Sequence, residues 1–464
     1  MTPNQYTPEE PICSIATALA PAALGIIRVS GKNCIELVSK VFSRPKVLLA
    51  AAGNTLVYGW IKDPAVSDEL SARIDEVMLS VYRAPKSFTG EDMVEISCHG
   101  GPSVVTAIHK LLLRSGFRQA NRGEYTFRAY INGKTDLTKA EAVKEIIDSH
   151  TDISRSHAVG RLSGSLFTEI DSIKKLIIDT LASIEVEIEY PEDEETIADT
   201  FDRKDIEIAI KRLQSLVDSW QGEKLYQDGA RVVLAGRTNA GKSSLFNAIL
   251  KEERAIVSDI EGTTRDWLES WASINGIPVR LFDTAGLRET SDQIEAQGVE
   301  ISRNLVHDAD VVLYLVDSQQ GLIKEDRDFI EHCTEPLIIV ETKIDKDGEN
   351  RENIEIKESF SVCKISSKTG EGIAELFNQI SAILTAGLSS ERQQAGLGSA
   401  RQKESVAEAL ECVKHALVSA DDNYTLDAVV QDLEDAIDSL GEVTGDVTPD
   451  DVLGSIFANF CVGK

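Results

Sequence analysis

The chain has little positive charge. Its 464 residues hold 48 lysines and arginines against 77 aspartates and glutamates, a formal net charge of −29 at pH 7. Contacts to nucleic-acid phosphates depend on lysine and arginine, so a protein of this composition is expected to bind RNA poorly by itself. If RNA is a substrate, a partner protein should supply much of the positive surface. The length and the 42% of hydrophobic residues indicate a globular protein of two or three domains.

Membrane spans, secretion signals and cysteine pairs are also missing. The apolar stretch of residues 12–27 is interrupted by polar residues and a proline, and it is too short to cross a bilayer. The first ten residues carry acids and no basic segment, which argues against a signal peptide. Seven cysteines are scattered without a C-x-x-C pair, as in proteins with reduced thiols. These absences predict a cytoplasmic protein that does not associate with a membrane.

What is present is a phosphate-binding loop. Residues 236–243 fit the pattern G-x-x-x-x-G-K-[ST], between a strand-like run at 231–235 and an apolar-faced helix at 244–250. The glycines let successive backbone N–H groups and the helix N-terminus point at phosphate. Lys242 is expected to reach the β- and γ-phosphates, and Ser243 to hold Mg²⁺. The flanking strand and helix favour this interpretation over an ordinary glycine-rich turn.

Two segments that follow supply contacts to Mg²⁺ and the γ-phosphate. In residues 262–266 the hydroxyl of Thr264 can close over both of them. In residues 281–286 a strand ends with Asp283, which can bind the Mg²⁺ shell, and Gly286 follows, whose N–H can sense the γ-phosphate. Each segment alone is also compatible with a strand end followed by a polar turn, so the order of all the segments matters.

Two later segments identify the base. A buried strand at 337–341 leads to the sequence Thr-Lys-Ile-Asp at 342–345. The Asp345 carboxylate can accept from the N1–H and the exocyclic amine of guanine, an arrangement that adenine does not offer, while Lys343 can cover the base. Residues 365–370 can donate backbone N–H groups to the guanine carbonyl oxygen. Because all five segments occur in the order of a Ras-like P-loop GTPase domain, we predict that the nucleotide is GTP.

The group that positions the attacking water is less clear. Leu287 stands directly after the Asp-x-x-Gly motif, where such domains usually have glutamine, and it cannot orient water. A nearby carboxylate could take this role, although most of them are expected to be solvated charges: Glu289, Asp292, Glu295 and Glu300. Arg265 and Arg288 are candidates for a cation that stabilises the transition state, and a monovalent ion could replace them.

Hydrophobic spacing divides the rest of the chain. Up to about residue 132, short strands are expected at 24–29, 56–61, 76–82 and 94–97, and a helix at 102–114. From Leu162 to Ile188 apolar residues recur every three or four positions, which predicts one long helix. Another helix is expected from Leu426 to Leu440, ended by Gly441, and a last one capped by Thr448. We expect these helices to pack together, with the GTPase domain inserted between them.

The chain resembles the MnmE (TrmE) family of tRNA wobble-uridine modification GTPases over essentially its whole length. Outside the GTPase motifs the matching segments are 24–31, 87–101, 122–137 and 460–464. The resemblance implies an α/β and α+β multidomain fold with an N-terminal α/β tetrahydrofolate-binding domain (1–132), an all-α helical domain in two parts (133–228 and 387–464) and an inserted Ras-like P-loop GTPase domain (229–386).

Three departures from the family pattern stand out. Thr342 replaces the asparagine of the usual Asn-Lys-x-Asp motif, so GTP affinity is expected to fall while discrimination by Asp345 survives. Thr238 replaces a proline in the phosphate-binding loop, and residues 20–23 replace a glycine-rich turn. These two changes bear on the rigidity of the loop and on the shape of the N-terminal pocket.

The resemblance also implies site residues. Family members are activated by K⁺ bound at the dimer face of the GTPase domains, with ligands matching Asn239, Ser258, Ile260 and Thr263. Glu295 matches the residue that orients water. The implied GTP contacts are Asn239, Ala240, Gly241, Lys242, Ser243, Ser244, Ser258, Thr263, Thr264, Asp283, Thr284, Ala285, Gly286, Thr342, Lys343, Asp345, Ser366, Ser367 and Lys368, with Ser243 and Thr264 also at Mg²⁺.

In the N-terminal domain the residues that match folate contacts are Arg28, Glu95, Lys134 and Lys464. A carboxylate can read the donor-rich pterin ring, and cations can meet the glutamate tail of a 5-formyl or 5,10-methylene tetrahydrofolate. Ordinary surface salt bridges are the alternative. His99 could be catalytic, but a structural histidine at a turn is the simpler interpretation. Cys461 is a candidate nucleophile, or an inert buried thiol.

The family resemblance implies a cytoplasmic homodimer. With the FAD-dependent MnmG protein, in a heterotetramer, it would add a carboxymethylaminomethyl or aminomethyl group at C5 of the wobble uridine of certain tRNAs. The tRNA would be held mainly through the partner, and GTP hydrolysis would open and close the GTPase domains. Two alternatives remain: a GTPase switch in ribosome or RNA assembly without one-carbon chemistry, and a folate-dependent methyltransferase with a regulatory GTPase.

Overall fold

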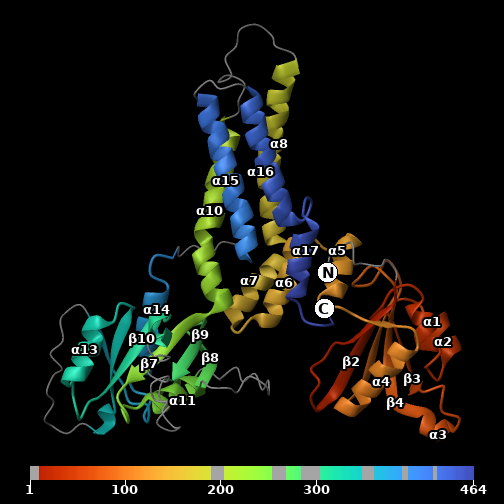
Figure 1. Cartoon of the computed structure of the whole chain (residues 1–464), viewed down its shortest axis with the longest axis horizontal. Coiled ribbons are helices and arrows are strands. Elements are labelled where there is room, and N and C mark those ends of the chain that lie inside the picture. Colours follow the sequence, from red (N-terminus) through yellow and green to blue (C-terminus); the bar gives the residue numbers. More distant parts are fainter. Residues whose placement is uncertain are drawn as a thin grey trace. The chain divides into compact units, whose positions relative to one another are not determined.

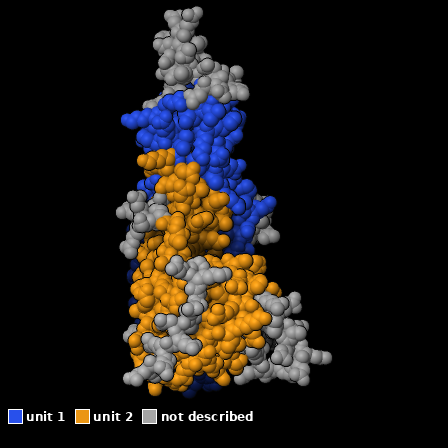
Figure 2. Space-filling model, turned by 90° about the vertical axis from the view of Figure 1, so that its left-hand side faces the viewer, with its two compact units in different colours: residues 1–144, 162–210, 404–464 blue, residues 145–161, 211–403 orange. Residues whose placement is uncertain are grey.

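The computed structural model describes residues 10–189, 203–252, 268–283, 304–346, 360–388, 395–421 and 426–463. The chain folds into two compact units, coloured in Figure 2. The first unit contains residues 1–144, 162–210 and 404–464, and the second contains 145–161 and 211–403. Segments far apart in the sequence therefore meet within each unit.

The first unit contains a six-stranded sheet with the order β3-β4-β5-β2-β1-β6 (Figure 1). Its strands are β1 (Ile12–Ile15), β2 (Ala22–Ser30), β3 (Thr55–Lys62), β4 (Arg73–Tyr82), β5 (Met93–Gly100) and β6 (Arg118–Gln119). The pairs are antiparallel except β1 with β6. The four strands expected from the sequence in this region are confirmed, as is the helix at 102–114.

Helices cover one face of this sheet. They are α1 (Cys34–Ser39), α2 (Pro45–Ala50) and α4 (Pro102–Arg114), whose apolar side chains join one buried core with the strands. Two short helices complete the region, α3 (Glu69–Ala72) and α5 (Glu124–Ile131). The strands alternate, as a sheet with one packed face requires: Val77 and Leu79 are buried, whereas Met78 between them is 39% exposed.

In the described segments outside the two sheets the chain forms further helices: α6 (Leu137–Asp148), α7 (Asp152–Leu162), α8 (Ser165–Glu189), α10 (Arg203–Asp228), α15 (Ala400–Asp421), α16 (Leu426–Thr444) and α17 (Asp450–Ala458). Helices α8 and α16 lie side by side (Figure 1). Each has an apolar stripe of 3.6-residue period, and Ile173 and Ile177 of α8 and Leu433 of α16 are fully buried. The expectation that the two helical pieces pack together is confirmed.

The single long helix expected from Leu162 to Ile188 is wrong at its start. Helix α7 ends at Leu162, and α8 begins at Ser165. Between them Gly164 has φ +96°, a left-handed conformation that interrupts a right-handed helix. The apolar spacing that predicted one helix began at Leu162, which is 39% exposed and does not belong to the buried stripe of α8, so periodicity alone could not reveal the break.

Two other helix ends also differ from expectation. Gly441 does not end α16, because its carbonyl oxygen accepts from the N–H of Gly445, and it is Gly445 that has φ +96°. The N-cap of α17 is Pro449 rather than Thr448, and no side chain caps the helix. Glycine tolerates a helix interior when the next turn still closes its hydrogen bonds.

The second unit contains a six-stranded sheet with the order β12-β11-β10-β7-β9-β8. Its strands are β7 (Ala230–Gly236), β8 (Leu268–Ile274), β9 (Ile277–Asp283), β10 (Val311–Asp317), β11 (Leu337–Thr342) and β12 (Ser361–Lys364). All neighbours are parallel except β8 and β9. Its helices are α11 (Lys242–Glu252), α13 (Lys324–His332) and α14 (Ile373–Leu384), with a 3₁₀ turn η3 (Ile344–Lys346).

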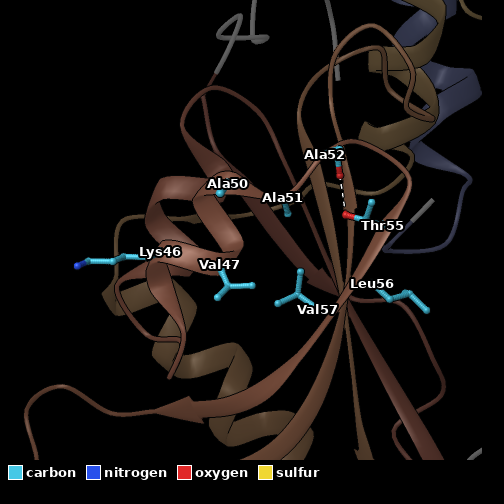
Figure 3. A pocket seen from close by; sticks show the side chains of 8 residues that line it. All are labelled: Lys46, Val47, Ala50, Ala51, Ala52, Thr55, Leu56 and Val57. Atoms are coloured by element: carbon cyan, nitrogen blue, oxygen red, sulfur yellow. Dashed lines mark hydrogen bonds between the residues drawn. The ribbon is translucent and has the colours of Figure 1, made fainter.

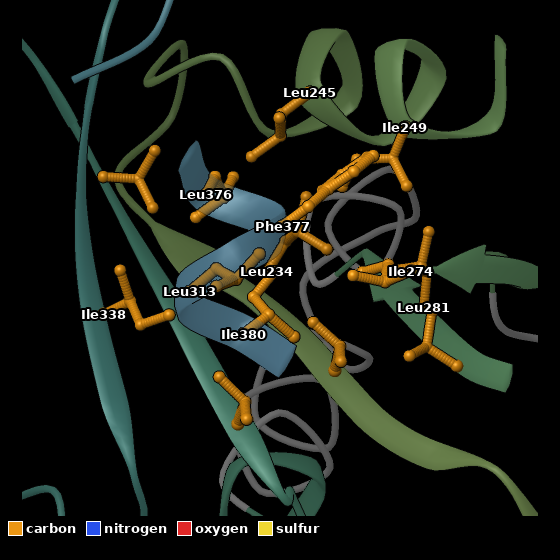
Figure 4. Packing of buried hydrophobic residues seen from close by; sticks show 14 of the residues in the cluster. Leu234, Leu245, Ile249, Ile274, Leu281, Leu313, Ile338, Leu376, Phe377 and Ile380 are labelled. Carbon is orange, nitrogen blue, oxygen red and sulfur yellow. The ribbon is translucent and has the colours of Figure 1, made fainter. Parts of the chain in front are cut away.

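Buried cores lie on both faces of this sheet, as a parallel sheet requires. On one face Leu245 and Ile249 of α11 meet Leu376 and Phe377 of α14 over Leu234 (Figure 4). The carboxyl ends of β7, β9, β10 and β11 share one edge of the sheet, and ligands of such folds bind at that edge. This architecture is the Ras-like GTPase fold predicted from the motifs.

Among the helices of the described segments, none combines the length and the apolar character that crossing a membrane would need.

Candidate nucleotide-binding site

The phosphate-binding loop joins β7 to α11 through residues with unusual backbone geometry. Gly236 has φ +132°, and a Cβ there would lie 2.5 Å from the carbonyl oxygen of Leu315. Gly241 has φ +98°, and Asn239 adopts the left-handed region at φ 63°. Only glycine fits the first position, because both the conformation and the neighbouring strand β10 exclude a side chain. The loop therefore curls tightly enough to aim backbone N–H groups at phosphate.

The lysine and the serine of the loop are held in place. Lys242 is 7% exposed, and its Nζ donates to the carbonyl oxygens of Gly236 at 2.8 Å and Arg237 at 2.7 Å. Ser243 lies in the first turn of α11, and its hydroxyl donates to Oδ2 of Asp283, at the end of β9, at 2.9 Å. Two hard oxygen ligands thus meet beside the ammonium group, as an Mg²⁺–phosphate site requires.

Thr342 ends β11 beneath the loop. Its side chain is buried, and Oγ1 donates to the carbonyl oxygen of Ala240 at 2.7 Å and lies 3.3 Å from that of Val316. The hydroxyl therefore ties the base-reading strand to the phosphate-binding loop, a contact worth about 1 kcal/mol. Threonine lacks the amide of asparagine, but its hydroxyl makes this link.

Asp317, at the end of β10, was not identified from the sequence. Its Oδ2 accepts from Lys343 Nζ at 2.7 Å, and the same ammonium donates to the carbonyl oxygen of Asn239 at 2.7 Å. Burial raises the pKa of Asp317, but the hydrogen bonds from Lys343 and from the Gln319 N–H outweigh it, so the pKa lies below its usual value. The charged carboxylate holds the lysine at the base-binding end. The sequence feature that could have identified Asp317 is an acidic residue at the end of a buried apolar strand, the feature that Asp283 also has.

The base-reading loops meet at Asp345. Its Oδ1 accepts from the hydroxyl of Ser366 at 2.8 Å, while Asp345 itself is exposed. Ser366 is buried, and its carbonyl oxygen accepts from the N–H of Gly370 at 2.9 Å, which closes the turn that contains Ser367 and Lys368. The Asp345 carboxylate can accept from the N1–H and the exocyclic amine of guanine, and the backbone N–H groups of the turn can donate to the guanine carbonyl oxygen.

The described part of the site thus brings together Asn239, Ala240, Gly241, Lys242, Ser243, Ser244, Asp283, Thr342, Lys343, Asp345, Ser366, Ser367 and Lys368 at the carboxyl edge of the sheet and its adjoining loops. The other residues expected at the nucleotide and at K⁺ lie outside the described residues: Ser258, Ile260, Thr263, Thr264, Thr284, Ala285, Gly286 and Glu295. The other carboxylates and arginines considered for catalysis lie outside them too.

In the N-terminal sheet Arg28 of β2 and Glu95 of β5 are paired in register. Arg28 Nη2 and Nε donate to Glu95 Oε1 at 2.7 and 2.9 Å, and Nη1 donates to the carbonyl oxygen of Gly463 at 3.1 Å. The guanidinium lies 5.6 Å from the ring centres of Phe88 and of Tyr125. The C-terminal segment therefore reaches the two expected folate residues, although Lys464 itself lies outside the described residues.

The third expected folate residue, Lys134, donates to the carbonyl oxygen of Pro85 at 3.0 Å. His99 lies on β5 rather than at a turn, which corrects the expectation. Its Nδ1 lies 2.7 Å from Asp75 Oδ1, and this hydrogen bond raises the pKa of the imidazole. A second bond joins the His99 N–H to Asp75, so the pair braces two strands and supports a structural role. Cys461 is exposed and not buried.

Two family models match the chain. The one described as the GTP-binding protein TrmE N-terminus matches residues 11–134, and the one described as the MnmE helical domain matches residues 137–461. The tRNA modification GTPase MnmE of Treponema denticola is 51% identical over 473 residues, 99% of either chain, and that of Treponema pallidum is 41% identical over 503 residues, 100% of either chain. A solved G domain of the T. maritima FeoB iron transporter is 27% identical and covers 33% of this chain and 98% of that chain, with a TM-score of 0.25.

Proposed function

This chain belongs to the MnmE family of tRNA modification GTPases, and we propose that it is a K⁺-activated GTPase that acts with a FAD-dependent MnmG-type partner. Together they would add a carboxymethylaminomethyl or aminomethyl group at C5 of the wobble uridine of certain tRNAs. The observation that carries the GTPase activity is the meeting of Lys242, Ser243 and Asp283 at one end of the sheet edge and of Lys343 and Asp345 at the other.

Hydrolysis of GTP needs charge stabilisation and positioning more than covalent chemistry. Lys242 would hold the β- and γ-phosphates, and the loop N–H groups would surround them. The oxygens of Ser243 and Asp283 fit Mg²⁺, with Thr264 as a further ligand; the ion neutralises the charge that develops on the phosphates when bound. Asp345 would select guanine and Lys343 would cover its face.

K⁺ would supply the charge that an arginine finger supplies elsewhere. Of the four proposed ligands, Asn239 is within the described residues, and its left-handed backbone at φ 63° in the phosphate-binding loop supports a place beside the β- and γ-phosphates. Ser258, Ile260 and Thr263 would complete the set. A K⁺ ion beside the β- and γ-phosphates stabilises the negative charge of the transition state as an arginine side chain does, because this effect depends on where the positive charge lies.

The N-terminal residues suit a tetrahydrofolate in its 5-formyl or 5,10-methylene form, the proposed one-carbon donor. Both bonds from Arg28 use Glu95 Oε1, so Oε2 can accept from the donor-rich pterin. The side chains of the pair are 17% and 22% exposed, which leaves them within reach of a ligand. Lys134 and Lys464 would meet the acidic tail.

The proposed domain boundaries lie at 132/133, 228/229 and 386/387.

We further propose a cytoplasmic homodimer that joins the partner in a heterotetramer and holds tRNA mainly through it. The uncovered face of the N-terminal sheet supports a dimer: Leu24, Tyr58 and Met78 are 64%, 48% and 39% exposed, and Tyr58 and Met78 are paired in register. Exposed apolar side chains gathered on one face are typical of protein interfaces. GTP hydrolysis would open and close the paired GTPase domains.

One assay tests the core of this proposal. GTP hydrolysis should be faster in KCl than in NaCl at equal ionic strength, on the order of tenfold or more, because the ion takes the place of an arginine finger. Asn239→Ala should abolish this difference and leave the turnover in NaCl unchanged. A K⁺ response that survives in Asn239→Ala would remove that ligand from the site. A tetrahydrofolate titration on the same sample separates the proposal from an RNA-assembly switch, which predicts no folate binding.

Glu295 is proposed to orient the attacking water. Glu295→Ala should keep the GTP dissociation constant of the wild type and lose hydrolysis by about 10²-fold or more, as expected for loss of a positioned acid–base group. The measurement is single-turnover hydrolysis alongside equilibrium binding of a fluorescent GTP analogue. Weaker binding with proportionate loss of turnover would instead indicate a structural residue, and Glu300→Ala serves as the matched control.

A further inference from the structure

The acidic character of the chain is not evenly spread. Residues 1–134 contain 15 lysines and arginines against 12 aspartates and glutamates, a net charge of +3. The remaining 330 residues carry a net charge of −32. A polyanion approaching this protein is therefore repelled by most of the chain and least by the N-terminal domain, because phosphate contacts depend on local positive charge.

About half of the cations of that domain are paired with neighbouring carboxylates. Seven of the fifteen form ion pairs with carboxylates: Arg28, Lys62, Arg73, Arg83, Arg114, Arg118 and Arg128. Arg44, Lys46 and Lys86 are exposed and have no ion pair with any residue of the described segments. All three lie around the short helix α2.

Hydrogen bonds to the backbone bring these cations to one place. Arg44, just before α2, donates from Nη1 to the carbonyl oxygen of Tyr58 on β3 at 3.1 Å. At the other end of α2, Arg83 donates to the carbonyl oxygen of Leu49 at 3.0 Å, and its distance to Asp92 is 3.6 Å. The N–H of Lys86 donates to the carbonyl oxygen of Arg83 at 2.9 Å, which places Lys86 in the same turn. We call Arg44, Lys46, Arg83 and Lys86 the α2 cations.

A pocket of about 500 Å³ lies between α2 and the start of β3. It is lined by Lys46, Val47, Ala50, Ala51, Ala52, Thr55, Leu56 and Val57, so its walls are small and apolar (Figure 3). Lys46 extends outward beside it, and Leu56 is 66% exposed. Pockets of this volume accept small molecules or single groups of larger ones.

We propose that this surface is where the protein itself contacts tRNA. The α2 cations would bind successive phosphates, and the apolar pocket would accept a base that has left its stack, which is how proteins read single-stranded loops of RNA. Charge complementarity favours RNA over a protein partner: within the described segments, three of the α2 cations have no ion pair, and Asp92, beside Arg83, is the one carboxylate paired with the group. The inference rests on the proposed role in tRNA modification and adds to the contacts supplied by the MnmG-type partner.

Binding of tRNA to the full chain by fluorescence anisotropy, over about 50–200 mM salt, tests this assignment. Lys46→Ala and Lys86→Ala should each lower the slope of log K against log salt by about 1 and the double variant by about 2, with affinity at low salt falling about tenfold or more. Lys110→Ala is the matched control, because Lys110 is an exposed lysine of the same domain on α4. Val47→Ser, which changes the apolar wall that α2 gives the pocket, should weaken binding several-fold with no change in slope.

All variants should retain the wild-type thermal midpoint and the wild-type K⁺-stimulated GTP hydrolysis, so loss of tRNA affinity cannot come from unfolding or from the GTPase site. Equal affinity and slope in the double variant and the wild type would overturn the assignment while leaving the proposed function intact. No tRNA binding by the wild type at low salt would overturn it as well. If the double variant lost affinity for the MnmG-type partner and kept tRNA binding, the surface would belong to that protein instead.

Discussion

Replacing Lys242 with alanine should lower kcat/KM for GTP by on the order of 10²–10³, the usual effect of removing one preorganised charge from a transition state. The ammonium is 7% exposed and is held by the carbonyl oxygens of Gly236 and Arg237. Its position therefore depends on the loop backbone. Steady-state hydrolysis at saturating Mg²⁺ gives the ratio directly.

Lys251→Ala is the matched control for this change. Lys251 is an exposed lysine in the last turn of the same helix α11, so its loss changes the net charge equally and leaves the phosphate-binding loop untouched. Its kcat/KM should stay within about twofold of the wild type, as for surface substitutions in general. Similar losses in both variants would mean that total charge, rather than the loop, governs turnover, and the site assignment would be wrong.

Asp345→Asn should exchange the preferred nucleotide. The carboxylate accepts two hydrogen bonds from guanine, each worth about 1.5–3 kcal/mol because the acceptor is charged, so GTP affinity should fall by on the order of 10²-fold or more. Xanthosine triphosphate presents a carbonyl where guanine has an amine, and an asparagine amide can donate to it. Equilibrium competition between GTP, xanthosine triphosphate and ATP measures the exchange.

The contact between Asp345 and Ser366 provides the control. The Ser366 hydroxyl donates to Asp345 Oδ1 at 2.8 Å, so Ser366→Ala removes an orienting bond and leaves the carboxylate in place. GTP affinity should fall by about fivefold, the effect of about 1 kcal/mol, with GTP still preferred over xanthosine triphosphate. An Asp345→Asn protein that keeps the wild-type preference would show that guanine is read elsewhere.

The sequence predicted elements well where the local pattern was strong. The helix at 102–114 has the bounds expected for it, and strands β2 to β5 lie where alternation placed them. The predictions from the sequence failed at helix ends. The break at Gly164 lies just after Leu162, which has the apolar spacing of α8 but is exposed, and Gly441 lies within α16 because the following turn keeps its hydrogen bond. Both errors arise because the spacing of apolar residues does not show where a helix begins or ends; hydrogen bonds and tertiary burial decide that.

The nucleotide and its phosphate-binding loop were determined by the sequence alone, since their function depends on backbone geometry that glycines at fixed spacing dictate. Which side chains hold one another was decided only by the tertiary structure. Asp317 meets Lys343, and Thr342 meets Ala240, because β7, β10 and β11 lie side by side with their carboxyl ends at one edge. The pairing of Arg28 with Glu95 and the position of Lys46 beside the pocket likewise follow from strand register and helix placement, which are set by long-range packing and not by neighbours in the chain.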